Sequence, residues 1–424
     1  MLDLRSIREV PEPARAALAR RGAADALDEL LRFDERRREL LPEVEERRAR
    51  QNRASDQIAA AKRSGEDAEP LIAEMRQVSA EVKELESELA EVESKRDELL
   101  STLPNLPEPE APEGSTEDDA VVLREVGERP RFEFEIRDHL DLGLANGWIE
   151  MEKAGEASGS RFAYLLGDLV LVELALVRLA IELAGGEGFV PVVPPVLVRE
   201  GPLYGTGFFP GEREMTYEIP RDELFLVGTS EVSLAALHAD EILDAGDLPR
   251  SYAGLSTCFR REAGAAGKDT RGIFRVHQFD KVEMFSFVRP EESRSEHERL
   301  LAIQERILQA LEIPYRVVDI AVGDLGAAAA RKFDCEAWIP SQERYRELTS
   351  CSNTTDYQAR RLGVRFRPEP EATPVHPHTL NGTAVAVGRT LIALLENGQR
   401  ADGSVRLPGA LRDAGAPAQI GGQA

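Results

Sequence analysis

Apolar residues recur at alternating intervals of four and three between Leu71 and Leu99, and no other pattern constrains the fold of this chain as tightly. The seam comprises Leu71, Met75, Val78, Val82, Leu85, Leu89, Val92 and Leu99, with Arg96 as its polar member. Such a heptad pattern predicts a long helix that packs against another helix. Residues 27–63 are also dense in Glu, Arg and Ala, and Ser64-Gly65-Glu66-Asp67 supplies a turn. We predict an antiparallel helical hairpin with arms of about 30–35 residues, in which Pro42 bends the first arm or marks its beginning.

The two arms differ in charge. Residues 32–63 hold ten Lys and Arg against seven Asp and Glu, a net +3, whereas residues 66–98 hold four against twelve, a net −8. A basic arm suits a phosphate backbone, although a solvated coiled coil, for example one that mediates dimerisation, is the more common reason for such a pattern. The candidate phosphate contacts are Arg36, Arg37, Arg47, Arg48, Arg50, Arg53, Lys62 and Arg63.

Length, charge and cysteine content bound the class of protein. The 424 residues suffice for two or three domains at about 100–200 residues each. A net charge of −24 disfavours indiscriminate nucleic-acid binding, so any RNA contact requires a local basic face. Cys258, Cys335 and Cys351 are too few and too scattered for a disulfide framework, which favours the cytoplasm. The N-terminus lacks a signal-peptide core, and charges interrupt the most apolar stretch, residues 164–181, so we expect no membrane span.

Composition also suggests domain boundaries. Residues 104–117 include four prolines and no large apolar run, which is typical of a linker. The residues beyond it mix short strand patterns with amphipathic helices. We therefore predict an N-terminal arm at 1–103, a linker at 104–117 and a second domain at 118–424.

One segment, residues 258–283, has a charge that opposes that of the whole chain. Its cations are Arg260, Arg261, Lys268, Arg271 and Arg275. The flanks 258–262 and 272–283 alternate apolar and charged residues, so we predict two strands joined by a long glycine-rich tip. Guanidinium groups, an aromatic ring and carboxylates on its faces suit a phosphate, a purine and an ammonium or hydroxyl group. A charged surface hairpin with satisfied ion pairs is the alternative.

The run FRREAGAAGKDTRGIFRVHQFDKVE in this segment resembles motif 2 of the class II aminoacyl-tRNA synthetases, in the form found in seryl-tRNA synthetases of the bacterial type. The resemblance continues almost to the C-terminus. The other matching segments are residues 188–198 (motif 1, the dimer interface of class II enzymes), 229–231 (a Thr-Ser-Glu loop where the family has Thr-Ala-Glu), 334–361 (the ATP-side segment) and 376–399 (motif 3). Taken alone, Thr229-Ser230-Glu231 fits a helix N-cap equally well.

The resemblance implies roles for individual residues. It implies that ATP contacts Arg260, Arg261, Glu262, Arg275, Val276, Phe279, Glu347, Leu348, Thr349, Ser350 and Arg389, with Arg260, Arg275 and Arg389 as catalytic cations. It implies that serine contacts Thr229, Ser230, Glu231, Arg260, Glu283, Asn381 and Thr383, and that Glu347 and Ser350 hold Mg²⁺. Thr349 and Thr383 stand where serine is common in the family, and both keep the hydroxyl group.

The implied architecture is α+β: a long N-terminal helical hairpin followed by a class II catalytic domain on an antiparallel sheet flanked by helices. The implied reaction is ATP-dependent activation of L-serine to seryl-adenylate, followed by transfer to the 3′ end of tRNA(Ser), and the resemblance extends this to tRNA(Sec). The implied partners are these tRNAs, serine, ATP and a second copy of the chain bound through the catalytic domain, without a membrane. No zinc is expected, since the cysteines do not offer the motifs of zinc-dependent serine enzymes.

Two alternatives from other classes remain. One is a related ligase that charges a carrier protein, but such proteins lack a hairpin of this length. The other is a non-catalytic RNA-binding paralogue, in which loss of the arginines or of the Thr-x-Glu loop would be expected.

Overall fold

The computed structural model describes residues 1–263, 269 and 271–422. The chain forms two compact units, Leu2–Leu103 and Pro104–Ala424, the second of which also includes Met1. The predicted cation Lys268 lies outside the described residues.

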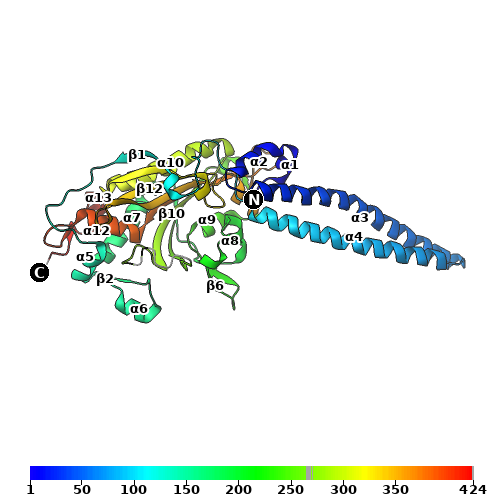
Figure 1. Ribbon diagram of the computed structural model, residues 1–424, viewed down its shortest axis with the longest axis horizontal. Coiled ribbons are helices and arrows are strands. Elements are labelled where there is room, and N and C mark those ends of the chain that lie inside the picture. The colour runs from blue at the N-terminus through cyan, green and yellow to red at the C-terminus, as the bar shows by residue number, and fades with distance from the viewer. Residues whose placement is uncertain (264–268, 270, 423–424) are drawn as a thin grey trace. The chain divides into compact units, whose positions relative to one another are not determined.

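The smaller unit is helical. Its helices are α1 (Leu4–Glu9), α2 (Pro11–Ala19), α3 (Ala24–Ser64) and α4 (Glu69–Thr102). α3 and α4 lie side by side as an antiparallel pair (Figure 1), and the chain leaves α3 at Gly65, whose left-handed backbone (φ 78°) suits a residue without a side chain. The buried positions of the pair include Leu27, Leu30, Leu40 and Val44 on α3 and Val78, Val82, Val92 and Leu100 on α4. The predicted hairpin is confirmed.

Pro42 was predicted either to bend the first arm (α3) or to mark its beginning, and the second alternative is wrong. The helix is 41 residues long and continues through the proline. An interior proline removes one backbone hydrogen bond and crowds the preceding turn. The apolar contacts with α4 on both sides of Pro42 offset that local cost, because most helical stability in proteins comes from tertiary packing.

An eight-stranded sheet organises the larger unit. Its strands, in order across the sheet, are β1 (Val121–Val126), β11 (Tyr315–Asp319), β12 (Arg331–Ile339), β13 (Arg344–Asn353), β15 (His378–Ala386), β10 (Gln278–Val288), β9 (Arg250–Phe259) and β4 (Val190–Val192). Neighbours are antiparallel except β4 and β9, which are parallel. The predicted α+β class on an antiparallel sheet is confirmed. Pro194 and Pro195 follow the edge strand β4 instead of lying within a strand, so they remove no ladder hydrogen bond.

Shorter elements complete the larger unit. The helices are α5 (His139–Ala145), α6 (Glu152–Ser158), α7 (Asp168–Gly186), α8 (Glu200–Thr206), α9 (Glu231–Ala235), α10 (Ser293–Ala310), α11 (Tyr357–Arg361), α12 (Val387–Gly398) and α13 (Gly409–Asp413). The small strands are β2 (Ile149–Glu150), β3 (Tyr164–Leu165), β5 (Leu197–Val198), β6 (Tyr217–Ile219), β7 (Leu224–Leu226), β8 (Ile242–Asp244), β14 (Arg365–Arg367), β16 (Val405–Arg406) and β17 (Gln419–Ile420). Among the described residues, none of these helices combines the length and the apolar character that a membrane crossing requires.

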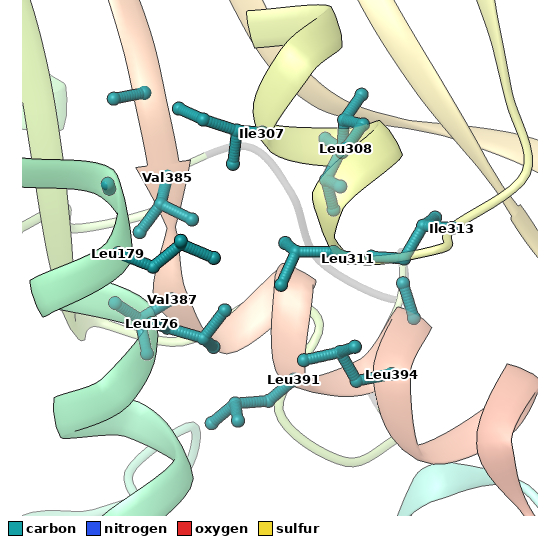
Figure 2. Packing of buried hydrophobic residues seen from close by; sticks show 14 of the residues in the cluster. Leu176, Leu179, Ile307, Leu308, Leu311, Ile313, Val385, Val387, Leu391 and Leu394 are labelled. Atoms are coloured by element: carbon teal, nitrogen blue, oxygen red, sulfur yellow. The ribbon is translucent and has the colours of Figure 1, made fainter. Parts of the chain in front are cut away.

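The main hydrophobic cluster joins the sheet to three helices. Figure 2 shows part of this cluster, with Leu176 and Leu179 of α7, Ile307 and Leu308 of α10, Val385 of β15, and Leu391 and Leu394 of α12. Successive residues of β10 alternate between the two faces of the sheet: Val282 and Met284 pack in this cluster, whereas Phe285 and Phe287 pack in a second cluster with α9 and α11. The second face also carries the polar residues described below.

The predicted hairpin of two antiparallel strands is confirmed, but both strands were predicted too long at the tip: residues 260–262 and 272–277 are not in strands. β9 ends at Phe259 and β10 begins at Gln278, directly opposite it, so the described residues between them, 260–263, 269 and 271–277, lie outside the sheet. Glu262 has φ +50°, a left-handed conformation that no strand contains. The alternation of charged and apolar residues arises because side chains of the connection divide between a cavity and the core.

Residues that follow the helical hairpin belong to the larger unit. Asn105 is 4% exposed, and its side-chain amide donates hydrogen bonds to the carbonyls of Ala328 and Thr354 and to the Thr355 hydroxyl. The Glu108 N–H donates to the carbonyl of Ala330. The proline-rich segment is therefore fixed along much of its length against the larger unit.

Candidate active site

A cavity of about 270 Å³ opens on the face of the sheet opposite α7 and α10, and the first turn of α12 reaches its edge. Among its lining residues are five acids and five bases: Glu212, Glu231, Glu262, Glu283 and Glu347, with Arg260, Arg275, Lys281, Lys332 and Arg389. Charge is therefore balanced here although the chain as a whole is strongly acidic. Five buried or half-buried cations around one cavity provide a site for anions.

One end of the cavity combines an aromatic ring with two guanidinium groups. The Arg260 guanidinium lies 5.3 Å from the centre of the Phe279 ring, and its Nε donates to the carbonyl of Gly228. Arg275 donates from Nη1 to Glu262 Oε2 at 2.7 Å, and its buried Nε has no hydrogen-bond partner among the described residues. A flat ring beside unsatisfied guanidinium donors suits an aromatic base attached to phosphate groups.

A second group of charges lies on β12, β13 and the first turn of α12. Arg389 donates to the carbonyl of Glu347 and lies 3.4 Å from its carboxylate. Desolvation opposes ionisation of Glu347, but the nearby cations Arg389, Lys332 and Arg260 dominate and lower its pKa to about 2. Glu347 is therefore an anion at neutral pH.

The third group combines buried acids with hydroxyl groups. Glu283 Oε2 accepts a hydrogen bond from Thr383 Oγ1 at 3.2 Å, and Glu231 accepts one from the Gln358 amide at 2.7 Å. Burial, together with the negative charge of Glu283, raises the pKa of Glu231 to about 7. This end of the cavity therefore offers two carboxyl groups and a hydroxyl group, which suit an amino acid with a polar side chain.

The structure brings most of the predicted residues to this cavity. Those that line it are Thr229, Glu231, Arg260, Glu262, Arg275, Val276, Phe279, Glu283, Glu347, Leu348, Ser350, Asn381, Thr383 and Arg389. They come from segments more than 150 residues apart in sequence, which the strand order of the sheet places together.

Three predicted residues do not line the cavity. Arg261 is exposed, and its backbone N–H donates to the carbonyl of Met215. Thr349 is buried, and its hydroxyl oxygen has no hydrogen-bond partner among the described residues. The Ser230 hydroxyl points to the carbonyl of Gly254 at 3.3 Å and makes no side-chain cap on α9.

Gly254 allows α9 to approach the sheet closely. A Cβ atom at this position would lie 2.9 Å from Leu234 Cδ1 and 3.0 Å from Ser230 Oγ. Gly254 lies opposite Glu283 in the antiparallel β9–β10 ladder, so α9 packs closely on the face of the sheet that carries Glu283.

Sequence reasoning missed several lining or supporting residues, among them three with a charged or amide side chain. Lys281 and Lys332 line the cavity, and the buried amide of Gln358 fixes Glu231. Lys281 could have been found, because it is two residues from Glu283 on one strand and must share its face. Gln358 carried no such signal, since its role depends on the tertiary packing of α11.

The basic residues of the helical hairpin are mostly paired across it. Five of the eight predicted phosphate contacts form salt bridges with acids of α4: Arg36 with Glu88, Arg37 with Glu93, Arg47 with Glu81, Arg48 with Glu86 and Arg50 with Glu74. Arg53 and Lys62 make no ion pair among the described residues, and Arg63 donates to the carbonyl of Ala59. The charge difference between the arms is thus largely satisfied within the hairpin.

Comparison with known proteins decides the family. Residues 1–107 match the seryl-tRNA synthetase N-terminal domain, and residues 216–398 match the tRNA synthetase class II core domain (G, H, P, S and T). A serine–tRNA ligase from Acidothermus cellulolyticus is 53% identical over 97% of both chains, and one from Nocardia farcinica is 50% identical over 97% of both. The chain belongs to the seryl-tRNA synthetase family.

A solved structure from this family agrees closely in fold. The seryl-tRNA synthetase of Pyrococcus horikoshii, complexed with ATP, has a TM-score of 0.91 and 42% identity, with 99% of each chain covered. The recognition of the family from motif 2 is therefore confirmed, and so is the class II core.

Proposed function

We propose that this chain is a serine–tRNA ligase that activates L-serine with ATP and transfers it to the 3′ end of tRNA(Ser). Membership of the family supports the proposal. The structural observation that carries it is the convergence of four separate sequence segments on one cavity, which places anion-binding cations beside two buried carboxylates. A carrier-protein ligase is disfavoured because residues 1–107 match the seryl-tRNA synthetase N-terminal domain.

In the proposed reaction the serine carboxylate attacks the α-phosphorus of ATP, and pyrophosphate leaves as the adenylate forms. The enzyme supplies no nucleophile, so catalysis depends on aligning two anions and offsetting their charge. Arg260 contacts the α-phosphate and the serine carboxylate, while Arg275 and Arg389 hold the terminal phosphates. Adenine stacks on Phe279, with Glu262 at its exocyclic amine.

At the other end of the cavity, Glu231 and the Thr229 main chain bind the serine ammonium group. Glu283 and Thr383 bind the serine hydroxyl. A site that hydrogen-bonds a substrate hydroxyl rejects an analogue without it by about 10⁴–10⁵, because its own polar groups are left unpaired. Alanine is therefore excluded at the activation step.

Magnesium fits the oxygen donors on β12 and β13. Glu347 and Ser350 line the cavity, and Asp334, opposite Ser350 in the ladder, has a buried Oδ1 without a hydrogen-bond partner among the described residues. Mg²⁺ prefers one or two carboxylates together with substrate phosphates. Glu347 and Ser350 would hold the ion, which would neutralise phosphate charge. We expect no role for zinc.

A second copy of the chain fits the apolar surface formed by α7 and β4. Large apolar side chains are exposed there: Val170, Leu171 and Leu174 on α7, with Val190 and Val193 at β4. Apolar patches of this kind mark protein interfaces. We propose that a homodimer forms through this surface of the catalytic unit.

For the remaining partners, we propose that the helical hairpin binds the tRNA by backbone and shape contacts, and that tRNA(Sec) is a second substrate. We further propose that the enzyme acts in the cytoplasm, consistent with the three cysteines, which are all free and buried.

ATP–pyrophosphate exchange with each of the twenty amino acids tests the function. Exchange that depends on serine, followed by charging of tRNA(Ser), is the expected result. Exchange with a different amino acid, or none with serine, would contradict the proposal.

A further inference from the structure

Lys281 lies at the centre of the amino-acid end of the cavity, although no role has been assigned to it. The residue is 6% exposed, its Nζ lies 2.5 Å from Glu283 Oε2, and it donates a hydrogen bond to Thr229 Oγ1 at 2.6 Å. One ammonium group thus contacts both the residue proposed to bind the serine hydroxyl and the loop proposed to bind the serine amino group.

These contacts determine which atoms remain available to a substrate. Thr229 Oγ1 also accepts the N–H of Glu231 at 3.2 Å, so both of its lone pairs are occupied. Glu283 Oε2 accepts from Lys281 and from Thr383. Glu283 Oε1 makes no hydrogen bond among the described residues, and it is therefore the acceptor left for a substrate hydroxyl.

The charges of this pocket also require a cation at position 281. Glu283 is 2% exposed and shares the pocket with the half-buried Glu231. Two carboxylates in a desolvated pocket repel each other, and an isolated buried anion is strongly disfavoured. The Lys281 ammonium compensates Glu283, and the ammonium of the amino-acid substrate then compensates Glu231.

We propose that Lys281 is a specificity-determining positioning residue, which holds the Glu283 carboxylate so that Oε1 stays free to accept a hydrogen bond and thereby makes the pocket select a hydroxylated amino acid. The inference rests on the proposed role of Glu283. Lys281 does not contact the substrate and acts through the carboxylate. Without the Lys281 ammonium, Glu283 Oε2 loses a donor and the carboxylate is held less firmly in this orientation, so the serine hydroxyl gains less from the pocket and alanine is rejected less strongly.

The test compares serine with alanine in ATP–pyrophosphate exchange catalysed by the full-length Lys281→Met variant. We expect the ratio of kcat/KM for serine to kcat/KM for alanine to fall by about tenfold or more, while the KM for ATP stays within about twofold. The ratio is measured on one preparation, so it does not depend on the fraction of folded enzyme. An unchanged ratio would overturn the proposal.

Lys332→Met is the matched control. Lys332 lines the same cavity and is paired with a carboxylate, Asp334, at 3.1 Å, but it contacts neither Thr229 nor Glu283 in the structure. Replacing Lys332 should leave the serine-to-alanine ratio unchanged, whatever its effect on the KM for ATP. A ratio that falls equally in both variants would show that any lost cation has this effect, and it would also overturn the proposal.

A double variant separates failure of this inference from failure of the role of Glu283. In Glu283→Gln alone, the ratio of kcat/KM for serine to kcat/KM for alanine should fall to a small fraction of its original value. Adding Lys281→Met should lower the ratio no further, because the lysine acts through that carboxylate. If Glu283→Gln keeps the ratio, the proposed role of Glu283 is wrong. If Glu283→Gln loses it but Lys281→Met does not, only the role of Lys281 is wrong.

Discussion

Ion pairs of nearly the same length occur in the helical hairpin and in the cavity, yet their surroundings differ. Arg37 and Glu93 on the hairpin lie 2.7 Å apart with side chains 29% and 37% exposed, whereas Arg275 and Glu262 in the cavity lie 2.7 Å apart with the carboxylate 9% exposed. Exposed pairs contribute about 0–1 kcal/mol and exchange partners easily. Buried pairs lose a partner only at high cost, so they hold a fixed geometry. The hairpin is thus suited to grip a charged polymer, and the cavity to position small substrates.

Removing the hairpin should give the largest effect and separate the two regions completely. Deleting residues 28–100 leaves the whole larger unit in place. We expect serine-dependent pyrophosphate exchange to be retained, and tRNA charging to fall by about 10³-fold or more because the phosphate contacts are lost. Both rates are measured on the same preparation. Loss of exchange would show that the cavity depends on the hairpin.

Within the cavity, replacing the proposed hydroxyl acceptor should have the next largest effect. We expect Glu283→Ala to reduce kcat/KM for serine in exchange by about 10³-fold, because the hydroxyl loses its acceptor and Lys281 loses its partner. ATP binding, followed by fluorescence or calorimetry, serves as the control for folding. Exchange close to that of the unmodified enzyme would remove Glu283 from the serine site.

The pH dependence of serine binding should be intermediate in size. Because the pKa of Glu231 is raised to about 7, this carboxyl is mostly neutral at pH 6 and mostly ionised at pH 8. The serine ammonium requires the ionised form, so the KM for serine should fall by about tenfold between pH 6 and pH 8. The KM for ATP over the same range is the control. A KM for serine that does not change, or that rises with pH, would contradict this role.

Replacing basic residues of the hairpin should have the smallest effects. These variants test which cations are available to tRNA. Arg53 and Lys62 make no ion pair among the described residues, whereas Arg37 is held by Glu93. Replacing Arg53 and Lys62 together with alanine should weaken tRNA binding several-fold and reduce its salt dependence by about one unit of slope for each cation. Arg37→Ala should change tRNA affinity less and stability by no more than about 1 kcal/mol. Equal losses would show that the salt bridges open on binding.

The sequence predicted the hairpin and the cavity in different amounts of detail. The heptad spacing from Leu71 to Leu99 was sufficient for the hairpin, because a periodic seam depends only on the helix itself. It could not predict the salt bridges between the arms, since these depend on the register between two helices. Of the two alternatives for Pro42, that the arm begins there is wrong, because the helix continues through the proline.

For the cavity, the motif resemblance identified most of the lining residues but misassigned their local structure. Residues 260–262 and 272–277 were predicted as strands and instead belong to the connection between β9 and β10. Gln358 and Lys332 could not be singled out, because only the tertiary structure places them beside the other charges. The structure was also needed to decide which of the predicted residues face the cavity. Arg261 is exposed and Thr349 is buried, and neither of them lines it.

The missing side chain at Gly254 has a consequence for how this enzyme can change. Gly254 lies opposite Glu283, and α9, which carries Glu231, packs against its bare backbone, although Gly254 does not line the cavity. A larger residue at this hidden position would have to displace Leu234 or Ser230, so the spacing between the helix that carries Glu231 and the strand opposite Glu283 depends on a residue that contacts neither substrate.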